Sequence, residues 1–294
     1  MQSKNLILLL IFLFVLSAPG FSHDKSKDSD STKTWNWEDF KSEIEKFQKK
    51  GKPALSLSYG FSRIKLKDIN TSFAKPNLLE LKLGHASESL ADFDEITKYR
   101  FTNVFLSYVS TELSKNNAVD GLRSSLWRFG GSFSSGYGYN FGDQSIVLYN
   151  SGSFNWSKLD LKDFPTEAQE KDRLDRFNNS FRFGTSVESG IRFKIIPLIA
   201  VEAGYERAII FERHLFWKWF GSEVIYFAGQ GVLDAFIHEI KDSSPIAAPV
   251  VSFVLKSALS YGMYELRQDK MNWPFTSAAP LAYDQFKFGI SFIF

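Results

Sequence analysis

The sequence contains no cysteine, and its positive and negative charges nearly cancel. Without cysteine the chain has no disulfide bonds, no thiol catalysis, no cysteine metal ligands and no lipid attachment through an N-terminal cysteine. Its 35 Lys and Arg offset 33 Asp and Glu to a net charge of +2, and no basic block stands out, so no nucleic-acid partner is expected. Phosphate loops, nucleotide fingerprints and dense metal-ligand clusters are also lacking, so no cofactor is expected.

Long hydrophobic runs are lacking beyond the first residues. Lys4 precedes an apolar run from Leu6 to Leu16, and small residues follow up to Ser22. This layout predicts a signal peptide over residues 1–22, because the apolar run is too short to span a bilayer comfortably. An uncleaved N-terminal anchor is the less favoured alternative.

Aromatic residues, in contrast, are abundant. They make up 16% of the chain, and 30 of them are Phe. That is high for a water-soluble domain, yet no later segment is a clean apolar helix of twenty residues. Aromatic richness without membrane helices is typical of a transmembrane β-barrel, whose rings face lipid and form girdles at both interfaces.

Residues 23–53 precede the predicted barrel. The first part, to Thr34, is almost entirely polar and predicts a disordered leader. From Trp35 to Lys50 apolar residues recur at spacings of three and four, which predicts an amphipathic helix that ends at Gly51 and Pro53. This helix could lie on the inner surface of the membrane that holds the barrel, or it could plug or cap the barrel mouth.

Strict alternation of apolar and polar residues marks the predicted strands. It runs through residues 55–62, 127–141, 181–195 and 199–211. Successive side chains of a strand point to opposite faces, so each segment has one apolar face and one face of Ser, Gly, Arg, Glu or Lys. A polar face this rich in charge indicates a polar lumen with lipid outside.

Weaker alternation near residues 77–87, 101–111 and 145–158, together with the final segment, brings the count to about eight strands. We therefore expect an all-β transmembrane domain over residues 54–294, an antiparallel up-and-down barrel. The connections at Gly142–Gln144 and Ile196–Pro197 are tight, which places them on the periplasmic side. The polar segment 160–179 falls on the outside.

The last strand carries a family resemblance. Aromatic and aliphatic residues alternate with polar or small ones up to the terminal residue, at positions Phe286, Phe288, Ile290, Phe292 and Phe294. This segment resembles the C-terminal signal strand of small Gram-negative outer-membrane β-barrel proteins, without identifying a member. The resemblance implies export to the cell outer membrane, insertion by the barrel-assembly machinery and contact with outer-membrane lipids.

Residues 214–267 interrupt the alternation before the last strand. They predict an apolar two-helix insert, broken at Ser243–Pro245. Such helices must bury their apolar surface, but the lumen of an eight-stranded barrel is nearly filled by side chains. The favoured expectation is a helical hairpin that caps the outer mouth or lies at the interface, where it offers a docking surface to a protein partner.

Few residues are candidates for chemistry. The inward charges predict an ion-pair network in the lumen, formed by Arg182, Glu188, Arg192, Lys194, Glu202 and Glu206. His85 and Ser87 share a face and loosely resemble the site of outer-membrane lipid A deacylases. The predicted topology, however, puts them on the periplasmic side of the membrane, where those enzymes do not act. Asp234 and His238 lie one helical turn apart, and a structural pair is favoured over a metal site.

These observations favour an outer-membrane barrel with a structural or interaction role, more consistent with a non-enzyme than with an enzyme. Two alternatives remain open at this point. One is transport of a small apolar or amphipathic solute through or along the barrel. The other is a lipid-modifying enzyme.

Overall fold

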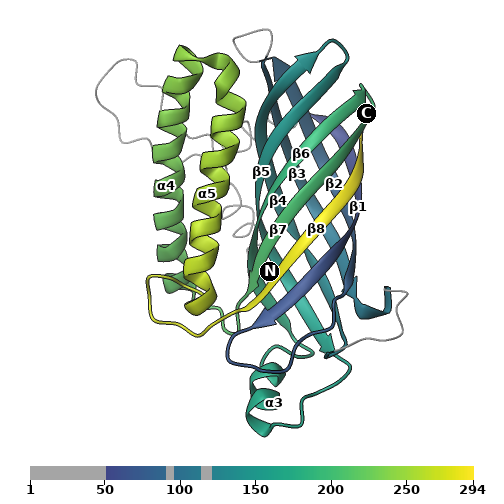
Figure 1. The fold of residues 1–294 in the computed structure, drawn as a ribbon, viewed down its shortest axis with the longest axis vertical. Coiled ribbons are helices and arrows are strands. Elements are labelled where there is room, and N and C mark those ends of the chain that lie inside the picture. Colours follow the sequence, from purple (N-terminus) through teal and green to yellow (C-terminus); the bar gives the residue numbers. More distant parts are fainter. Residues whose placement is uncertain (1–50, 91–95, 114–120) are drawn as a thin grey trace, which may run out of the picture. The chain divides into compact units, whose positions relative to one another are not determined.

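The computed structural model describes residues 51–90, 96–113 and 121–294, so the predicted signal peptide and most of the 23–53 segment lie outside it. The described part contains eight strands and three α-helices (Figure 1). The strands are β1 (Lys52–Leu66), β2 (Asn77–Leu90), β3 (Ile96–Ser110), β4 (Ser124–Phe141), β5 (Gln144–Leu161), β6 (Phe181–Ile196), β7 (Ile199–Ile210) and β8 (Leu281–Ile293). The helices are α3 (Ala168–Asp175), α4 (Phe216–Ser243) and α5 (Ala248–Asp269).

The eight strands form a closed antiparallel barrel. Each strand lies beside the next one in the sequence, and β8 completes the cylinder by pairing with β1, with Ala54 opposite Ile293 and Leu66 opposite Leu281. Closure leaves no strand edge unpaired, which is the condition for a sheet to stand in lipid. The predicted fold class, an up-and-down barrel of eight strands with a two-helix insert before the last, is therefore confirmed.

Alternate side chains point into and out of the barrel, and the polar ones point inward. In β1, Ser56 and Ser62 are 1% and 5% exposed, whereas Leu57 and Phe61 are 53% and 55% exposed. A water-soluble barrel has the opposite arrangement. The exposed apolar surface continues around the wall through Leu79, Leu83, Val104, Leu106, Trp127, Phe129, Phe286, Phe288 and Ile290.

The two ends of the barrel differ in the length of their connections. We call the end with connections 91–95, 142–143 and 197–198 the short-turn end. The other end carries connections 67–76, 111–123, 162–180 and 211–280, and we call it the long-loop end. At the short-turn end Gly142 has a φ of +70°, a conformation that glycine adopts without strain and that lets two residues join β4 to β5.

Apolar side chains fill the barrel at both ends. At the long-loop end Leu78, Leu126 and Leu281 pack together, and Leu174 and Phe177, from α3 and the residues after it, complete this layer. At the short-turn end Ala54, Ala86, Phe101, Val147 and Ile293 belong to a second layer. The polar interior therefore lies between two apolar layers.

The helical hairpin of α4 and α5 lies against the outer wall of the barrel. Helix α5 packs on α4 and contacts β4, β5, β6 and β7 (Figure 1). Near the start of α4, the buried ring of Trp219 lies 5.9 Å from that of Phe154 on β5 and 5.3 Å from that of Phe183 on β6. The expectation of a cap over the outer mouth was wrong, because the hairpin lies along the outer wall, where α5 contacts four strands.

Candidate functional site

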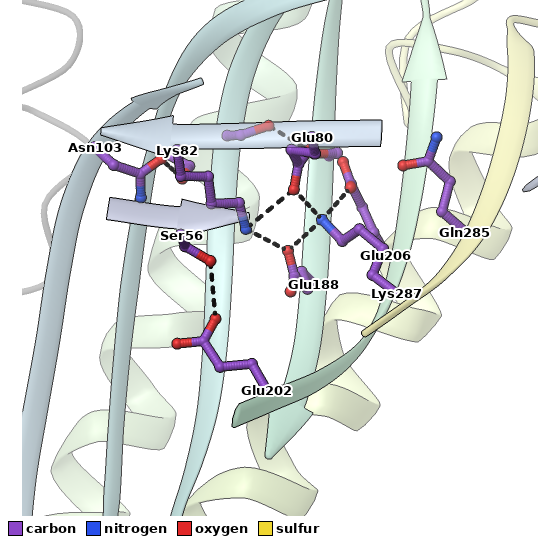
Figure 2. A network of polar contacts seen from close by, with 12 residues as sticks. Ser56, Glu80, Lys82, Asn103, Glu188, Glu202, Glu206, Gln285 and Lys287 are labelled. Atoms are coloured by element: carbon purple, nitrogen blue, oxygen red, sulfur yellow. Dashed lines mark hydrogen bonds and ion pairs between the residues drawn. The ribbon is translucent and has the colours of Figure 1, made fainter. Parts of the chain in front are cut away.

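Titratable side chains inside the barrel gather around the ammonium group of Lys287 on β8 (Figure 2). Its Nζ atom lies 2.9 Å from Oε1 of Glu80, 2.7 Å from Oε2 of Glu188 and 2.7 Å from Oε2 of Glu206. An ammonium group has three N–H donors, so each carboxylate accepts one. Lys82 adds a second ammonium 3.1 Å from Glu188 and 3.4 Å from Glu80. The three carboxylates are close enough together to hold a metal ion, and Lys287 takes the position of the cation.

Arg128 on β4 completes this central cluster. The side chain is fully buried, and its Nη2 donates to Oε1 of Glu206 at 2.7 Å while its Nη1 donates to Oε1 of Gln285 at 3.1 Å. The guanidinium lies 4.6 Å from the ring centroid of Tyr283, where a cation–π interaction is favourable. Three cations and three carboxylates therefore neutralise one another in the middle of the barrel.

A second cluster lies toward the short-turn end. Arg192 forms an ion pair with Glu88 and another with Glu202, whose Oε1 is 3.3 Å from its Nε. Lys194 reaches the other oxygen of Glu88 at 2.9 Å. The guanidinium of Arg192 also lies 4.8 Å from the ring centroid of Tyr99. Two cations again balance two carboxylates.

In this arrangement the buried charges compensate one another and leave little room for a ligand. Beside Lys82, Glu188 and neighbouring serines, a cavity of about 10 Å³ offers space for about one water molecule. Taking ions out of water costs several kcal/mol each unless partners compensate, and here every cation has a carboxylate within ion-pair distance. The geometry of the described interior is that of a packed polar core.

The sequence-predicted lumen residues divide into three groups. Glu188 and Glu206 lie in the central cluster, and Arg192, Lys194 and Glu202 lie in the second one. The structure places Arg182 apart from both. Near the start of β6 its guanidinium donates to the backbone carbonyls of Glu212 and Arg176, because these carbonyls lie nearer than any interior carboxylate.

Several members of the two clusters were not among the lumen residues predicted from the sequence. Glu80, Lys82, Glu88, Arg128 and Lys287 all lie on the inward face. A signal was present, because each occupies the position that alternates with outward apolar residues of its strand. In β2, Glu80 and Lys82 alternate with Leu79, Leu81 and Leu83.

The remaining candidates are scattered over the exterior. His85 and Ser87 point outward from β2 near the short-turn end, opposite Thr102 and Arg100 of β3.

Asp234 and His238, on α4, have different partners. Asp234 pairs with Lys256 of α5 at 2.6 Å, whereas Nδ1 of His238 lies 3.1 Å from Oδ2 of Asp242. The two side chains are thus not held together as a ligand pair.

The apolar residues of the proposed assembly signal form the outer face of β8. Phe286 and Phe288 contact one another edge to face at 4.9 Å between ring centroids, and Ile290 follows on the same face. Phe294 lies just beyond the strand, and its amide donates to the carbonyl of Pro53 at 2.9 Å. The terminal aromatic residue therefore stands at the rim of the short-turn end.

A carboxylate joins two connections at the long-loop end. Glu170 of α3 accepts hydrogen bonds of 2.5 Å from the Thr71 hydroxyl and 2.5 Å from the backbone N–H of Asn70. These bonds stabilise the ionised form, and the Thr71 hydroxyl foremost holds the pKa of Glu170 below its ordinary value. Glu170 therefore fastens segment 162–180 to segment 67–76 when it is ionised.

No protein-family model matches the chain, and no curated protein matches its sequence. Among solved structures it is similar to Neisserial surface protein A, with 10% identity and a TM-score of 0.38 over 82% of this chain and 97% of that one. It is also similar to Ail, the attachment invasion locus protein of Yersinia pestis, solved with the heparin analogue sucrose octasulfate, with 7% identity and a TM-score of 0.31 over 83% of this chain and 99% of that one. Both are eight-stranded outer-membrane barrels. The fold assignment depends on the strand pairing of the chain itself.

Proposed function

We propose that this chain is an outer-membrane β-barrel protein with a structural or interaction role. The observation that carries the proposal is the inversion of polarity: two neutralised charge clusters fill the interior, while Leu, Val, Phe and Trp cover the outer wall. An exposed apolar surface of this extent requires lipid or a partner around it. A filled interior favours a role for the outer surface.

The dimensions of the barrel support a transmembrane position. The described strands contain 12 to 18 residues, with β7 the shortest and β4 and β5 the longest. A tilted strand needs about 9–11 residues to cross the hydrocarbon core. The strands are therefore long enough to cross it and to extend into the headgroup region on both sides.

The filled interior weighs against transport of a solute through the lumen. Lys287 and Arg128 hold the centre, and the two apolar layers lie above and below it. The support for a lipid-modifying activity is the outward pair His85 and Ser87. The residues directly opposite them on β3 are not carboxylates, so no acidic group there orients the histidine. We therefore rank both alternatives below the structural or interaction role.

Export through a signal peptide and insertion by the barrel-assembly machinery belong to the same proposal. Replacing Phe294→Asp should reduce the amount of inserted barrel, because a charge replaces the terminal aromatic residue of the signal strand. Phe294→Tyr, which keeps the ring, is the matched control. Equal insertion of both variants would remove the assembly signal from the proposal.

Two measurements test the proposal as a whole. The mature protein should fractionate with the outer membrane and migrate differently on gels before and after heating, and the purified barrel should not produce conductance steps in planar bilayers. Recovery as a soluble periplasmic monomer would overturn the membrane assignment. Reproducible conductance steps would instead replace the structural role with transport.

A further inference from the structure

The helical hairpin extends along the barrel wall from one end to the other. Helix α4 begins six residues after β7 ends at Ile210, at the long-loop end. The connection between α4 and α5 lies at the short-turn end, where the Tyr139 hydroxyl near the end of β4 donates to the carbonyl of Ile246 at 2.6 Å. Helix α5 then returns to the long-loop end, where β8 begins at Leu281 (Figure 1).

The exposed surface of the hairpin is apolar over a defined length. Between Phe220 and Phe236, the exposed residues of α4 are Phe220, Val224, Ile225, Ala228, Gly231, Val232, Ala235 and Phe236. These 17 residues span about 25 Å at 1.5 Å per residue, which matches the apolar band of about 25 Å on outer-membrane barrels. Between Val250 and Tyr261, the exposed residues of α5 are Val250, Val254, Ala258 and Tyr261. Helix α5 with the turn before it, Pro245–Asp269, is also long and apolar enough to cross a membrane.

Charged side chains within this length are paired between the two helices, Glu223 in a buried position and Asp234 with a side chain that is 44% exposed. Oε1 of Glu223 on α4 lies 3.0 Å from Nη1 of Arg267 on α5, and Oδ1 of Asp234 lies 2.6 Å from Nζ of Lys256. Ionisable groups inside a membrane are costly and are retained where they pair with one another. The exposed ionisable residues of α4 lie instead beyond the apolar length, with Lys218 at one end and His238, Glu239 and Asp242 at the other.

Uncharged polar groups are also satisfied between the helices. The Tyr226 hydroxyl of α4 lies 2.9 Å from the Ser260 hydroxyl of α5, and the Gln230 amide donates to Tyr226 at 2.9 Å. Hydrogen bonds of this kind hold helices together in lipid, where apolar burial alone does not favour association.

The wall beneath α5 differs from the rest of the barrel exterior. Asn150 of β5 and Ser189 of β6 point outward side by side, and the Asn150 amide donates to both the Ser189 and the Ser257 hydroxyls at 2.9 Å. Ser257 belongs to α5 and also donates to Ser189 at 2.9 Å. Without α5 these wall groups would face lipid with fewer partners.

A second group of outward polar residues lies nearer the long-loop end, on β7 and β8. The guanidinium of Arg207 lies 4.4 Å from the ring centroid of Tyr261, and Asp284 accepts a hydrogen bond of 2.8 Å from the Tyr264 hydroxyl. Arg207 and Asp284 are direct cross-strand neighbours, and both tyrosines come from α5. The helix therefore covers a polar strip that crosses four strands of an otherwise apolar wall.

We propose that α4 and α5 form a membrane-spanning hairpin that shares the bilayer with the barrel, docked on the wall through α5 and bound by lipid acyl chains on the outer face of α4. This inference rests on the proposed outer-membrane position of the barrel. The apolar face of α4 continues the apolar band of the wall, its length matches that band, and its flanking charges fall at the two ends. The interhelical turn then lies in the periplasm.

Single cysteines can test the depth of the hairpin, because the native chain contains none. Spin labels at Val232→Cys, on the exposed face of α4, and at Val104→Cys, on the barrel wall, should both collide with oxygen and both be protected from a water-soluble nickel chelate. Val232 is 71% and Val104 is 64% exposed, so neither substitution disturbs packing. Asp175→Cys at the long-loop end should show the reverse pattern.

The outcomes separate this inference from the proposed function. Lipid depth at residue 104 with water exposure at residue 232 overturns the hairpin assignment and leaves the barrel in the membrane. Water exposure at both positions overturns both. Protection of residue 232 from oxygen and nickel alike would mean that a protein, or a second copy of the chain, covers α4 in place of lipid.

Sided labelling provides an independent readout of the turn. In intact cells an impermeant maleimide should react with Asp175→Cys and not with Ser243→Cys, which should become reactive once the outer membrane is permeabilised. Reaction of both variants in intact cells would place the turn outside and overturn the spanning arrangement.

Discussion

The protein buries polar groups in two places, inside the barrel and beneath α5, and the two places differ in what separates these groups from lipid. Inside the barrel, Lys287, Arg128 and their carboxylates come from five strands and are enclosed by the closed sheet itself. Beneath α5, Asn150 and Ser189 stand on the outer wall and are covered by a helix inserted between β7 and β8. The first arrangement depends on closure of the sheet, and the second depends on docking.

Substitutions in the two places should have different consequences for stability. An unpaired charge in the interior has no route to water, because apolar layers close both ends of the barrel. A polar group on the wall loses only its contacts with α5 when the helix is removed. Replacing that group by an apolar residue can then make the wall compatible with lipid. Interior substitutions should therefore be the more destabilising, and wall substitutions should be the more reparable.

The largest effect is expected at the centre. Lys287→Met should lower the free energy of unfolding by about 3–5 kcal/mol, because it leaves three buried carboxylates without their shared ammonium group. Urea denaturation of the barrel in lipid vesicles measures this loss. Lys162→Met is the matched control, since Lys162 pairs with Asp160 on the exposed surface and should change little. An equal loss of unfolding free energy in Lys287→Met and Lys162→Met would show that water reaches the interior cluster.

Removing the hairpin tests the second arrangement. Deleting residues 216–266, so that residues 211–215 and 267–280 join β7 to β8, should reduce the yield of folded barrel. The reason is that outward Arg207 would meet lipid at a cost of about 2–4 kcal/mol at the midplane and less near the interface. Adding Asn150→Leu, Ser189→Leu and Arg207→Leu should restore part of the yield. Equal yields of the two deletion variants, measured by heat-modifiable migration, would contradict the role of the polar strip.

A single contact between α5 and the wall should have a smaller effect. Ser257→Ala removes the hydrogen bonds to Asn150 and Ser189 and should cost about 0.6–1.7 kcal/mol, the range for such bonds within membranes. The change in the unfolding midpoint measures it. Ala258→Val, on the exposed face of the same helix, should leave the midpoint unchanged, and a shift as large as that of Ser257→Ala would argue against a specific contact.

The smallest effect concerns pH at the long-loop end. The pKa of Glu170 is lowered in the folded state by the Thr71 hydroxyl and the backbone N–H of Asn70, so its stabilisation is complete above the ordinary pKa of a glutamate and is lost as pH falls through the lowered value. The amide proton signal of Asn70 should titrate accordingly. In Glu170→Gln this titration should be absent, and its persistence would assign it to another group.

The strand pattern made the barrel predictable, because each side of a strand meets a single environment. Alternation over β4, β6 and β7 separated a polar face from an apolar one, and the charges on the polar face indicated a lumen. The same parity rule places Glu80 and Lys287 on the inward faces of β2 and β8. What parity cannot supply is which inward residues meet, since Lys287 and Glu80 are 207 positions apart and approach only across the closed barrel.

The position of the hairpin was not predictable from its own residues. Helical periodicity and apolar composition indicate surfaces that must be buried, but they do not identify the surface that buries them. A clue lay elsewhere, where Gly131, Ser135, Asn150 and Ser189 interrupt the outward apolar rows of their strands. Asn150 and Ser189 lie beneath α5, which gives their polarity a reason.

By itself, the sequence determined that strands would form, which face of each would be polar, and that two helices would precede the last strand. These properties depend on neighbours within a few residues, and local periodicity records them. Tertiary structure alone decided that Lys287 would bridge three carboxylates from three other strands and that the hairpin would dock along the wall. Both outcomes depend on the closed curvature of the sheet, which brings distant inward residues together and presents one continuous outer surface on which α5 finds its polar partners.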